Sequence, residues 1–255
     1  MSAYGMYLSA EGAQAQAKRL EVLSNNLANV ATPGFKRQLA IFQARYAEAI
    51  NQGDDVPGLQ SLNDLSGGIA VDATRTDFSQ GPMKNTGVPT DLAIVGDGFF
   101  MVDKDGEKLL TRAGNFRVTS EGQLVTQQGY SVLNDSGSAV TVDPEAGPIE
   151  FTDDGSIVQG FGADRQRIGQ DLAIVLPTNL GSLGHVGENL FRSPDAPQPS
   201  TDRRVAPEFL EQSSVQPALE MMRLIETSRA FEANMSLIKQ QDQMLGSLLN
   251  RVLRA

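Results

Sequence analysis

Apolar residues recur at a fixed spacing in the N-terminal region of the chain. From about Ala3 to Val30 they repeat every seven residues, and the repeat consists of Met6, Ala13, Leu20 and Leu27, with Leu23 and Val30 at its second position. A heptad repeat predicts a helix with an apolar seam along one side. Thr32-Pro33-Gly34 predicts where this helix ends, because proline lacks an amide donor and glycine adopts the left-handed conformation easily.

The C-terminal region carries a longer repeat of the same kind. Its seam positions again lie seven residues apart, at Leu224, Phe231, Ile238, Leu245 and Val252. They predict a helix of about 38 residues, roughly 55 Å long, that begins near Pro217, a residue suited to a first helical turn. We expect the two terminal helices to pair as a coiled coil. The N-terminal seam is rich in alanine and therefore thin, so we expect helices from other copies to cover the rest of it.

Between the helices the pattern changes to short β-branched or aromatic runs separated by glycine turns. From about Asp91 these turns recur every 8 to 12 residues or so, a spacing typical of all-β domains. Lys104-Asp105-Gly106 and Asp153-Asp154-Gly155 contain the Asp-Gly pairs that hairpin loops favour. This region is therefore predicted to be built of hairpins.

The whole pattern predicts an α+β fold, with long N- and C-terminal helices paired as a coiled coil and a central all-β domain of hairpins. The expected segments are an N-terminal helix and turn at 1–45, an extended linker at 46–90, the β-domain at 91–191, an extended return segment at 192–214 and the C-terminal helix at 215–255. Several prolines in the return segment favour an extended backbone.

Composition and charge exclude several classes of function. The 255 residues include no cysteine, which excludes disulfides and thiolate metal sites, and the formal net charge of −10 argues against a duplex nucleic-acid binder. The stretch 46–201 carries a net charge of −13 and the two ends together carry +3. This asymmetry suggests that the ends meet protein while the middle faces water or a charged neighbour.

The sequence shows no membrane or secretion signal. No apolar run reaches the length of a membrane span, and the opening MSAYGMYLSAEG lacks the cationic and apolar regions of a signal peptide. We therefore expect no membrane insertion. If the protein leaves the cytoplasm, we expect export without a cleavable signal peptide.

Candidate chemistry is sparse. His185 is the one histidine, so with no cysteine it cannot form a Cys/His dyad or a multi-histidine metal site, and no serine lies in a nucleophile elbow. The turns VDKDG and TDDGS resemble fragments of calcium loops but lack the full ligand spacing. We expect a structural or solvated His185, no enzyme activity, no cofactor and no metal.

Three asparagines interrupt the N-terminal helix just before its predicted end, in LSNNLANVATPGFKR at residues 23–37. Asparagine is a poorer helix former than glutamate, lysine or glutamine, so helix stability alone does not explain them. Asn25, Asn26 and Asn29 lie on the side of the helix away from the seam, where each amide offers a donor and an acceptor. A solvated face near a helix end is the ordinary explanation, and the complete string favours a contact surface instead.

This string resembles the N-terminal signature of the bacterial flagellar basal-body rod and hook protein family, through its NNLANV core and the TPGFK continuation. Residues 218–250 resemble the family's C-terminal helix, and residues 91–102 and 110–133 resemble strands of its central β-domain. The likeness is closer to the rod proteins with one β-domain than to the larger hook protein. Proximal and distal rod proteins share it, and the moderately long segment at about 46–68 favours the distal type.

The resemblance implies a structural subunit of the rod, which polymerises into a helical tube that forms the drive shaft between motor and hook. The implied partners are other copies of the chain, other flagellar rod and hook proteins and the flagellar type III export apparatus. The implied location is the periplasm-spanning rod of the basal body. A second hypothesis is an acidic β-domain that binds carbohydrate or calcium and is held in oligomers by its terminal helices.

The interface between copies is predicted to combine the apolar seams with polar side chains that fix the register, as a buried polar residue does in a coiled coil. The predicted interface residues are Leu20, Leu23, Asn25, Asn26, Leu27, Asn29, Val30, Gly34, Phe35, Leu224, Phe231, Asn234, Ile238, Asp242 and Leu245.

Overall fold

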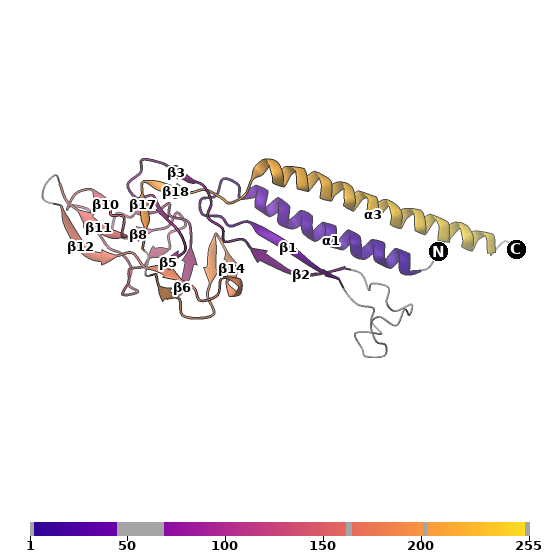
Figure 1. Cartoon of the computed structure of the whole chain (residues 1–255), viewed down its shortest axis with the longest axis horizontal. Coiled ribbons are helices and arrows are strands. Elements are labelled where there is room, and N and C mark those ends of the chain that lie inside the picture. Colours follow the sequence, from indigo (N-terminus) through magenta and orange to yellow (C-terminus); the bar gives the residue numbers. More distant parts are fainter. Residues whose placement is uncertain (1–2, 45–68, 162–164, 201–202, 253–255) are drawn as a thin grey trace. The chain divides into compact units, whose positions relative to one another are not determined.

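The structure, a computed structural model, divides into two compact units (Figure 1). It describes residues 3–44, 69–161, 165–200 and 203–252. The first unit, called here the helical unit, comprises Met1–Ala28, Gln38–Thr76 and Gln216–Ala255. The second, called the β unit, comprises Asn29–Arg37 and Asp77–Val215.

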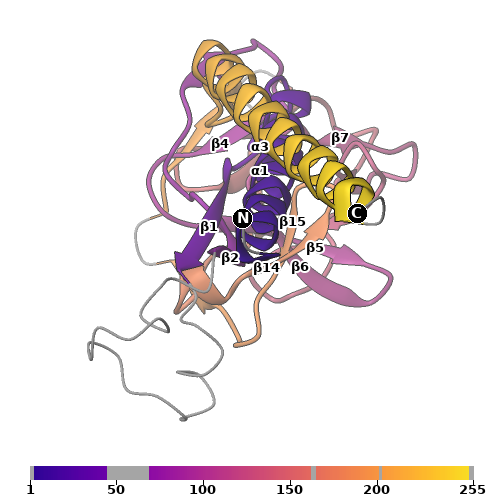
Figure 2. The same cartoon turned by 90° about the vertical axis from the view of Figure 1, so that its right-hand side faces the viewer.

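The helical unit consists of two long helices and a β-hairpin. Its elements are α1 (Ala3–Ala28), β1 (Gln38–Ala44), β2 (Ile69–Thr76) and α3 (Pro217–Val252). The helix α1 lies between α3 and the hairpin, as two perpendicular views show (Figure 1, Figure 2). Both helices were predicted close to these bounds, and Pro217 opens α3 at a position where its missing amide costs no hydrogen bond.

The predicted pairing of the terminal helices as a coiled coil is wrong. The buried residues of α1 are Ala13, Ala15, Val22, Leu23 and Asn26, and three of these five lie off the predicted seam. Their spacing places Ala15, Val22 and Asn26 on one side of the helix, and Asn26 contacts the hairpin. The helix therefore buries two faces, one of them against a β-hairpin, and a heptad repeat cannot reveal a partner that is not a helix.

The hairpin that covers α1 comes from the segment directly after the N-terminal motif. Strands β1 and β2 pair antiparallel from Gln38 opposite Thr76 to Ala44 opposite Ile69, with an irregularity between Ile41 and Phe42. The strand β2 and the following residues fall in the segment 46–90 that the sequence predicted as an extended linker, and 45–68 lie outside the described residues. The hairpin covers a side of α1 that lies away from the predicted seam.

The β unit is built of antiparallel strands. Its largest sheet runs in the order β14-β15-β6-β5-β9-β8-β7, and β13 joins it by pairing with β5 and with β16. A smaller sheet has the order β10-β11-β12, and β4 and β3 pair with β17 and β18. The prediction of a central all-β domain of hairpins is confirmed for the described residues.

The strands of the β unit follow one another closely along the chain. They are β3 (Met83–Asn85), β4 (Leu92–Ile94), β5 (Phe99–Lys104), β6 (Glu107–Thr111), β7 (Arg117–Val118), β8 (Leu124–Val125), β9 (Ser131–Val132), β10 (Ile149–Phe151), β11 (Ser156–Gln159), β12 (Gln166–Asp171), β13 (Ile174–Leu176), β14 (Gly184–Gly187), β15 (Leu190–Arg192), β16 (Gln198–Pro199), β17 (Val205–Pro207) and β18 (Phe209–Glu211), and a short 3-10 helix, η2 (Leu180–Ser182), precedes β14.

The turn between β5 and β6 shows how the sequence directs a hairpin. Lys104 lies opposite Glu107, so Asp105 and Gly106 alone form the loop. Both have positive φ, 54° and 85°. A two-residue loop with two positive φ angles matches the right-handed twist of the flanking strands, which is why Asp-Gly favours it.

The return segment at 192–214 supplies strands to the β unit as well as a connection. Within it, β17 pairs with β4 from Val205 opposite Ile94, and β18 pairs with β3 up to Glu211 opposite Met83. The first two strands of the β unit, β3 and β4, thus pair with its last two strands, β18 and β17.

Two apolar clusters stabilise the β unit. The larger one includes Leu92, Phe100 and Leu172, all fully buried. The smaller contains Phe99, Leu110, Val175 and Phe191, and the ring of Phe78 meets Phe99 and Phe191 edge to face, with centroids 5.7 and 5.3 Å away. Each large apolar side chain buried in this way contributes roughly 1.5–3 kcal/mol.

Replacing Gly114 by alanine should strongly destabilise the β unit. A Cβ at this position would lie 1.7 Å from the carbonyl oxygen of Leu92, which belongs to a buried strand, so backbone must shift. We expect Gly114→Ala to lower the free energy of unfolding by about 3 kcal/mol in urea denaturation. Gly246→Ala is the control, because a Cβ on Gly246 in α3 meets nothing within 4 Å and should be neutral or stabilising. Equal stability of the two variants would contradict this packing argument.

Candidate functional site

The predicted interface residues of the helical unit differ in exposure. Leu23 and Asn26 are buried. The half-buried ones are Leu20, Leu27, Leu224, Phe231, Asn234 and Ile238, and the exposed ones are Asn25, Asp242 and Leu245. The seams of α1 and α3 are thus only partly closed within the chain.

Asn26 has a specific task inside the helical unit. Its side-chain Nδ2 donates to the carbonyl oxygen of Gln38 at 2.8 Å, and its Oδ1 accepts from the Gln38 amide at 2.9 Å. The side chain is 1% exposed. The neighbouring Asn25 is exposed and reaches the side-chain oxygen of Gln38 at 3.1 Å. Asn26 therefore fixes the first residue of β1 against α1, because an amide can satisfy both backbone groups of one residue at once.

Small residues of α1 allow close contact with α3. A Cβ on Gly12 would lie 3.2 Å from Nδ2 of Asn234, and a Cβ on Gly5 would lie 3.5 Å from Nε2 of Gln241. The separation of two packed helices depends on the side chains at their contact. At these two positions, a glycine of α1 lies against an amide side chain of α3.

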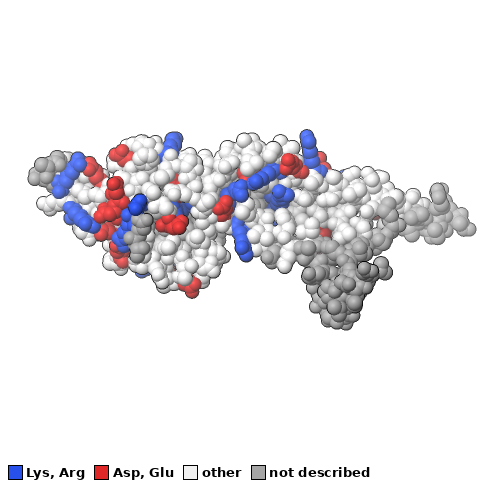
Figure 3. All heavy atoms as spheres, viewed as in Figure 1, with Lys and Arg blue, Asp and Glu red and all other residues white. Residues whose placement is uncertain are grey.

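The helix α3 also carries large apolar side chains that remain exposed. They are Met221, Met222, Ile225, Leu237, Met244 and Leu245, and on α1 Met6 and Tyr7 are exposed as well. Met222 is 51% exposed and Ile225 is 53% exposed. Figure 3 shows few charged side chains on the visible face toward the end of the helices that carries the chain termini, whereas Met222 and Ile225 lie near the other end of α3. Large exposed apolar side chains are typical of a protein contact where they form a patch.

The second half of the N-terminal motif belongs to the β unit. Asn29 and Val30 are half-buried, and Gly34 and Phe35 are buried. Gly34 has a φ of +68°, and a Cβ on it would lie 2.4 Å from the backbone carbonyl carbon of Arg112. Its amide donates to the carbonyl oxygen of Glu211 at 2.7 Å. Only glycine fits here, because both the backbone conformation and the close approach exclude a side chain.

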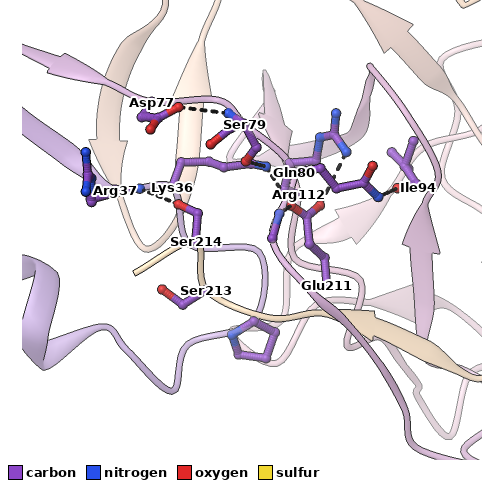
Figure 4. A network of polar contacts seen from close by, with 12 residues as sticks. Lys36, Arg37, Asp77, Ser79, Gln80, Ile94, Arg112, Glu211, Ser213 and Ser214 are labelled. Carbon is purple, nitrogen blue, oxygen red and sulfur yellow. Dashed lines mark hydrogen bonds and ion pairs between the residues drawn. The ribbon is translucent and has the colours of Figure 1, made fainter. Parts of the chain in front are cut away.

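Lys36 extends into the β unit and meets a buried ion pair (Figure 4). Its Nζ donates to Oε1 of Glu211 at 2.6 Å and to the carbonyl oxygen of Ser79 at 2.8 Å. Arg112 approaches the other oxygen, Oε2, at 3.3 Å, and the Gly81 amide donates to Oε1 at 2.8 Å. The side chains of Lys36, Arg112 and Glu211 are each at most 3% exposed. We call these three residues the charge cluster.

Burial perturbs the two cations of the charge cluster. It lowers the pKa of Lys36, and the Glu211 carboxylate opposes that shift. It also lowers the pKa of Arg112, again opposed by Glu211 and by Asp97. Arg112 gains further contacts, since its guanidinium donates to the carbonyl oxygen of Gly96 at 2.8 Å and lies 5.2 Å from the centre of the Phe99 ring.

Sequence reasoning missed the charge cluster. Lys36 lies in the quoted motif but was not among the predicted contact residues, and Arg112 and Glu211 carried no signal at all. Charged residues are almost never fully buried unless paired, so from the sequence alone each of these three residues is expected at the surface. A lysine directly after the buried Gly34 and Phe35 was the one available hint.

The described residues offer little for chemistry. Among them, no three His, Cys, Asp or Glu side chains gather as a metal would require. His185 lies on the exposed strand β14, and its ring packs edge to face on the buried Phe191, with ring centroids 5.4 Å apart. In the same part of the chain, no helix is both long and apolar enough to cross a membrane.

Known proteins resemble this chain over nearly all of its length. Three protein-family models match it, namely the flagella basal body rod protein at 6–36, the flagellar hook protein FlgE/F/G D1 domain at 93–159 and the flagellar basal body rod FlgEFG protein C-terminal region at 206–251. The flagellar basal-body rod protein FlgF of Caulobacter vibrioides is 36% identical over 237 residues, 92% of each chain. The FlgG of Bacillus subtilis is 31% identical over 257 residues, 96% of this chain and 97% of the relative.

The two neighbouring asparagines should respond differently to mutation. Asn26→Ala removes two hydrogen bonds and leaves both backbone groups of Gln38 without the partners they have in the structure. We expect it to lower the free energy of unfolding by about 2 kcal/mol. Asn25→Ala, the matched control on the same turn of α1, should change it by less than about 0.5 kcal/mol. Urea denaturation followed by circular dichroism measures both, and a similar loss for the two variants would refute the assignment.

The charge cluster should give the protein a distinctive alkaline stability. The pKa of Lys36 is lower in the folded chain than in the unfolded one, so above the folded value the unfolded state binds the extra proton. Stability therefore rises with pH toward 10.5, by at most about 1.4 kcal/mol per pH unit. Lys36→Met removes this titrating group. The stability of wild type minus that of Lys36→Met should increase between pH 7 and 10, and a flat or falling difference would contradict the argument.

Proposed function

Because the chain belongs to the family of flagellar basal-body rod proteins and is a structural subunit of the rod, we propose that copies join through the outer faces of α1 and α3. The observation that carries this proposal is that α3 exposes several large apolar side chains, among them Met222 and Ile225. Exposing them does not stabilise an isolated subunit, whereas a polymer buries them between copies.

In this proposal, the residues predicted for the interface form two groups that differ in how far their own chain buries them. Those with surface left to bury join copies, among them Leu20, Leu27, Phe231, Asp242 and Leu245. Those enclosed by their own chain act inside the subunit, and they are Leu23, Asn26, Gly34 and Phe35. Contacts that repeat from copy to copy in one direction build a helical polymer and not a closed dimer.

The family also supports a place and neighbours for the subunit. Its relatives are named as basal-body rod proteins, so this chain assembles into the flagellar rod with other flagellar proteins. We propose that the specific neighbours are other rod and hook proteins, that the rod passes through the periplasm and that the type III export apparatus delivers the subunit. A role without catalysis is part of the same proposal. Nothing in the comparisons supports the alternative of a carbohydrate or calcium binder.

Polar substitution on α3 should stop assembly and leave the subunit folded. Met222→Glu with Ile225→Glu places two charges where apolar side chains are buried between copies. Losing that burial costs roughly 3–6 kcal/mol per contact, at least about a hundredfold in association. Electron microscopy and sedimentation of purified protein, together with swimming of a strain that carries the variant, measure assembly.

The matched control is Phe161→Glu, because Phe161 is an exposed apolar residue of the β unit. It should assemble normally. The thermal melting midpoint should be unchanged in both proteins. Normal polymers from the α3 variant would rule out this face as the contact between copies.

A further inference from the structure

Two of the segments that connect the units, residues 29–37 after α1 and the residues directly before α3, lie side by side within the β unit. The Ser214 amide donates to the carbonyl oxygen of Phe35 at 3.0 Å, and the Arg37 amide donates to the hydroxyl oxygen of Ser214 at 2.9 Å. The Gly34 amide also donates to the carbonyl oxygen of Glu211. The segment that follows α1 and the segment that precedes α3 are therefore bonded to each other along several consecutive residues.

The charge cluster lies beside this contact, and its two buried cations require a carboxylate partner. It contains two cations and one anion, all buried, and they come from three distant parts of the chain. Lys36 arrives with the N-terminal connection, Arg112 follows β6, and Glu211 ends β18 in the return segment. A buried charge is costly unless it is paired, so Lys36 and Arg112 can share this space only when Glu211 lies between them.

We propose that the charge cluster is a folding clasp: the β unit accepts its N-terminal connection only together with its C-terminal one. With Glu211 absent, docking of residues 34–36 would bury two cations near each other and leave the Gly81 amide without its carboxylate partner. With Lys36 absent, Arg112 and Glu211 form a balanced pair. The two end segments of the β unit therefore fold onto it cooperatively. This folding does not depend on rod assembly.

The clasp predicts an unusual sign of coupling between two mutations in the full-length chain. Glu211→Gln should lower the melting midpoint by roughly 5–10 °C or more, because two buried cations lose their partner. Lys36→Met alone should lower it less. Adding Lys36→Met to Glu211→Gln should raise the midpoint above that of Glu211→Gln, because one of the two unpaired cations is removed.

Trypsin reports whether the N-terminal connection has left the β unit. Cleavage after Arg37 requires the residues around it to unfold locally, and the change at Glu211 lies in another part of the sequence. We expect Glu211→Gln to speed cleavage at this site at least about tenfold. Glu107→Gln is the control, because it also removes a carboxylate from an ion pair, the exposed one with Arg192, and should leave cleavage there unchanged.

Three outcomes would overturn the clasp. If adding Lys36→Met lowers the midpoint of Glu211→Gln further, the unpaired cations are not the cause of the instability. The same holds if Glu211→Gln does not fold and the double variant does not fold either. If Glu211→Gln melts early while the site after Arg37 stays protected, the two ends are not coupled. Recovery of folding in the double variant would support the clasp even if Glu211→Gln itself does not fold. All readouts use the unassembled protein, so they are independent of the proposed contact between copies.

Discussion

Two cations, Lys36 and Arg112, are buried in the β unit against a single carboxylate, that of Glu211. Two contacts fix the position of Glu211. The Gly81 amide donates to its carboxylate, and its backbone belongs to β18, which pairs with β3. It binds the beginning of the β unit to its end.

The N-terminal signature divides into two parts with separate tasks. In its helical part, Asn26 holds the first residue of β1 and so places a hairpin on α1. Its second part, Gly34 to Lys36, enters the β unit. Both tasks lie within one subunit. In the proposed assembly, the outer face of α3 is the surface that contacts neighbouring copies.

Sequence reasoning reached the helices, the hairpins and the family, and it failed where burial depends on distant partners. Heptad spacing located α1 and α3, and Asp105-Gly106 marked a loop, because both signals are local. The same spacing suggested a coiled coil, since it cannot show that a hairpin covers α1. Asn25 and Asn26 are neighbouring residues of the same type, yet Asn25 is exposed and Asn26 is buried. Glu211 lies 175 positions from Lys36, and no local pattern links them.

Hydrogen exchange of the unassembled protein tests the central claim most directly. The amides of Gly34, Gly81 and Ser214 each donate to a partner that belongs to the contact between the two connections. If this contact is made within one subunit, all three amides are protected in dilute solution and open with the same free energy. Exchange at the rate of an unfolded chain in the monomer, with protection only after polymerisation, would contradict the account.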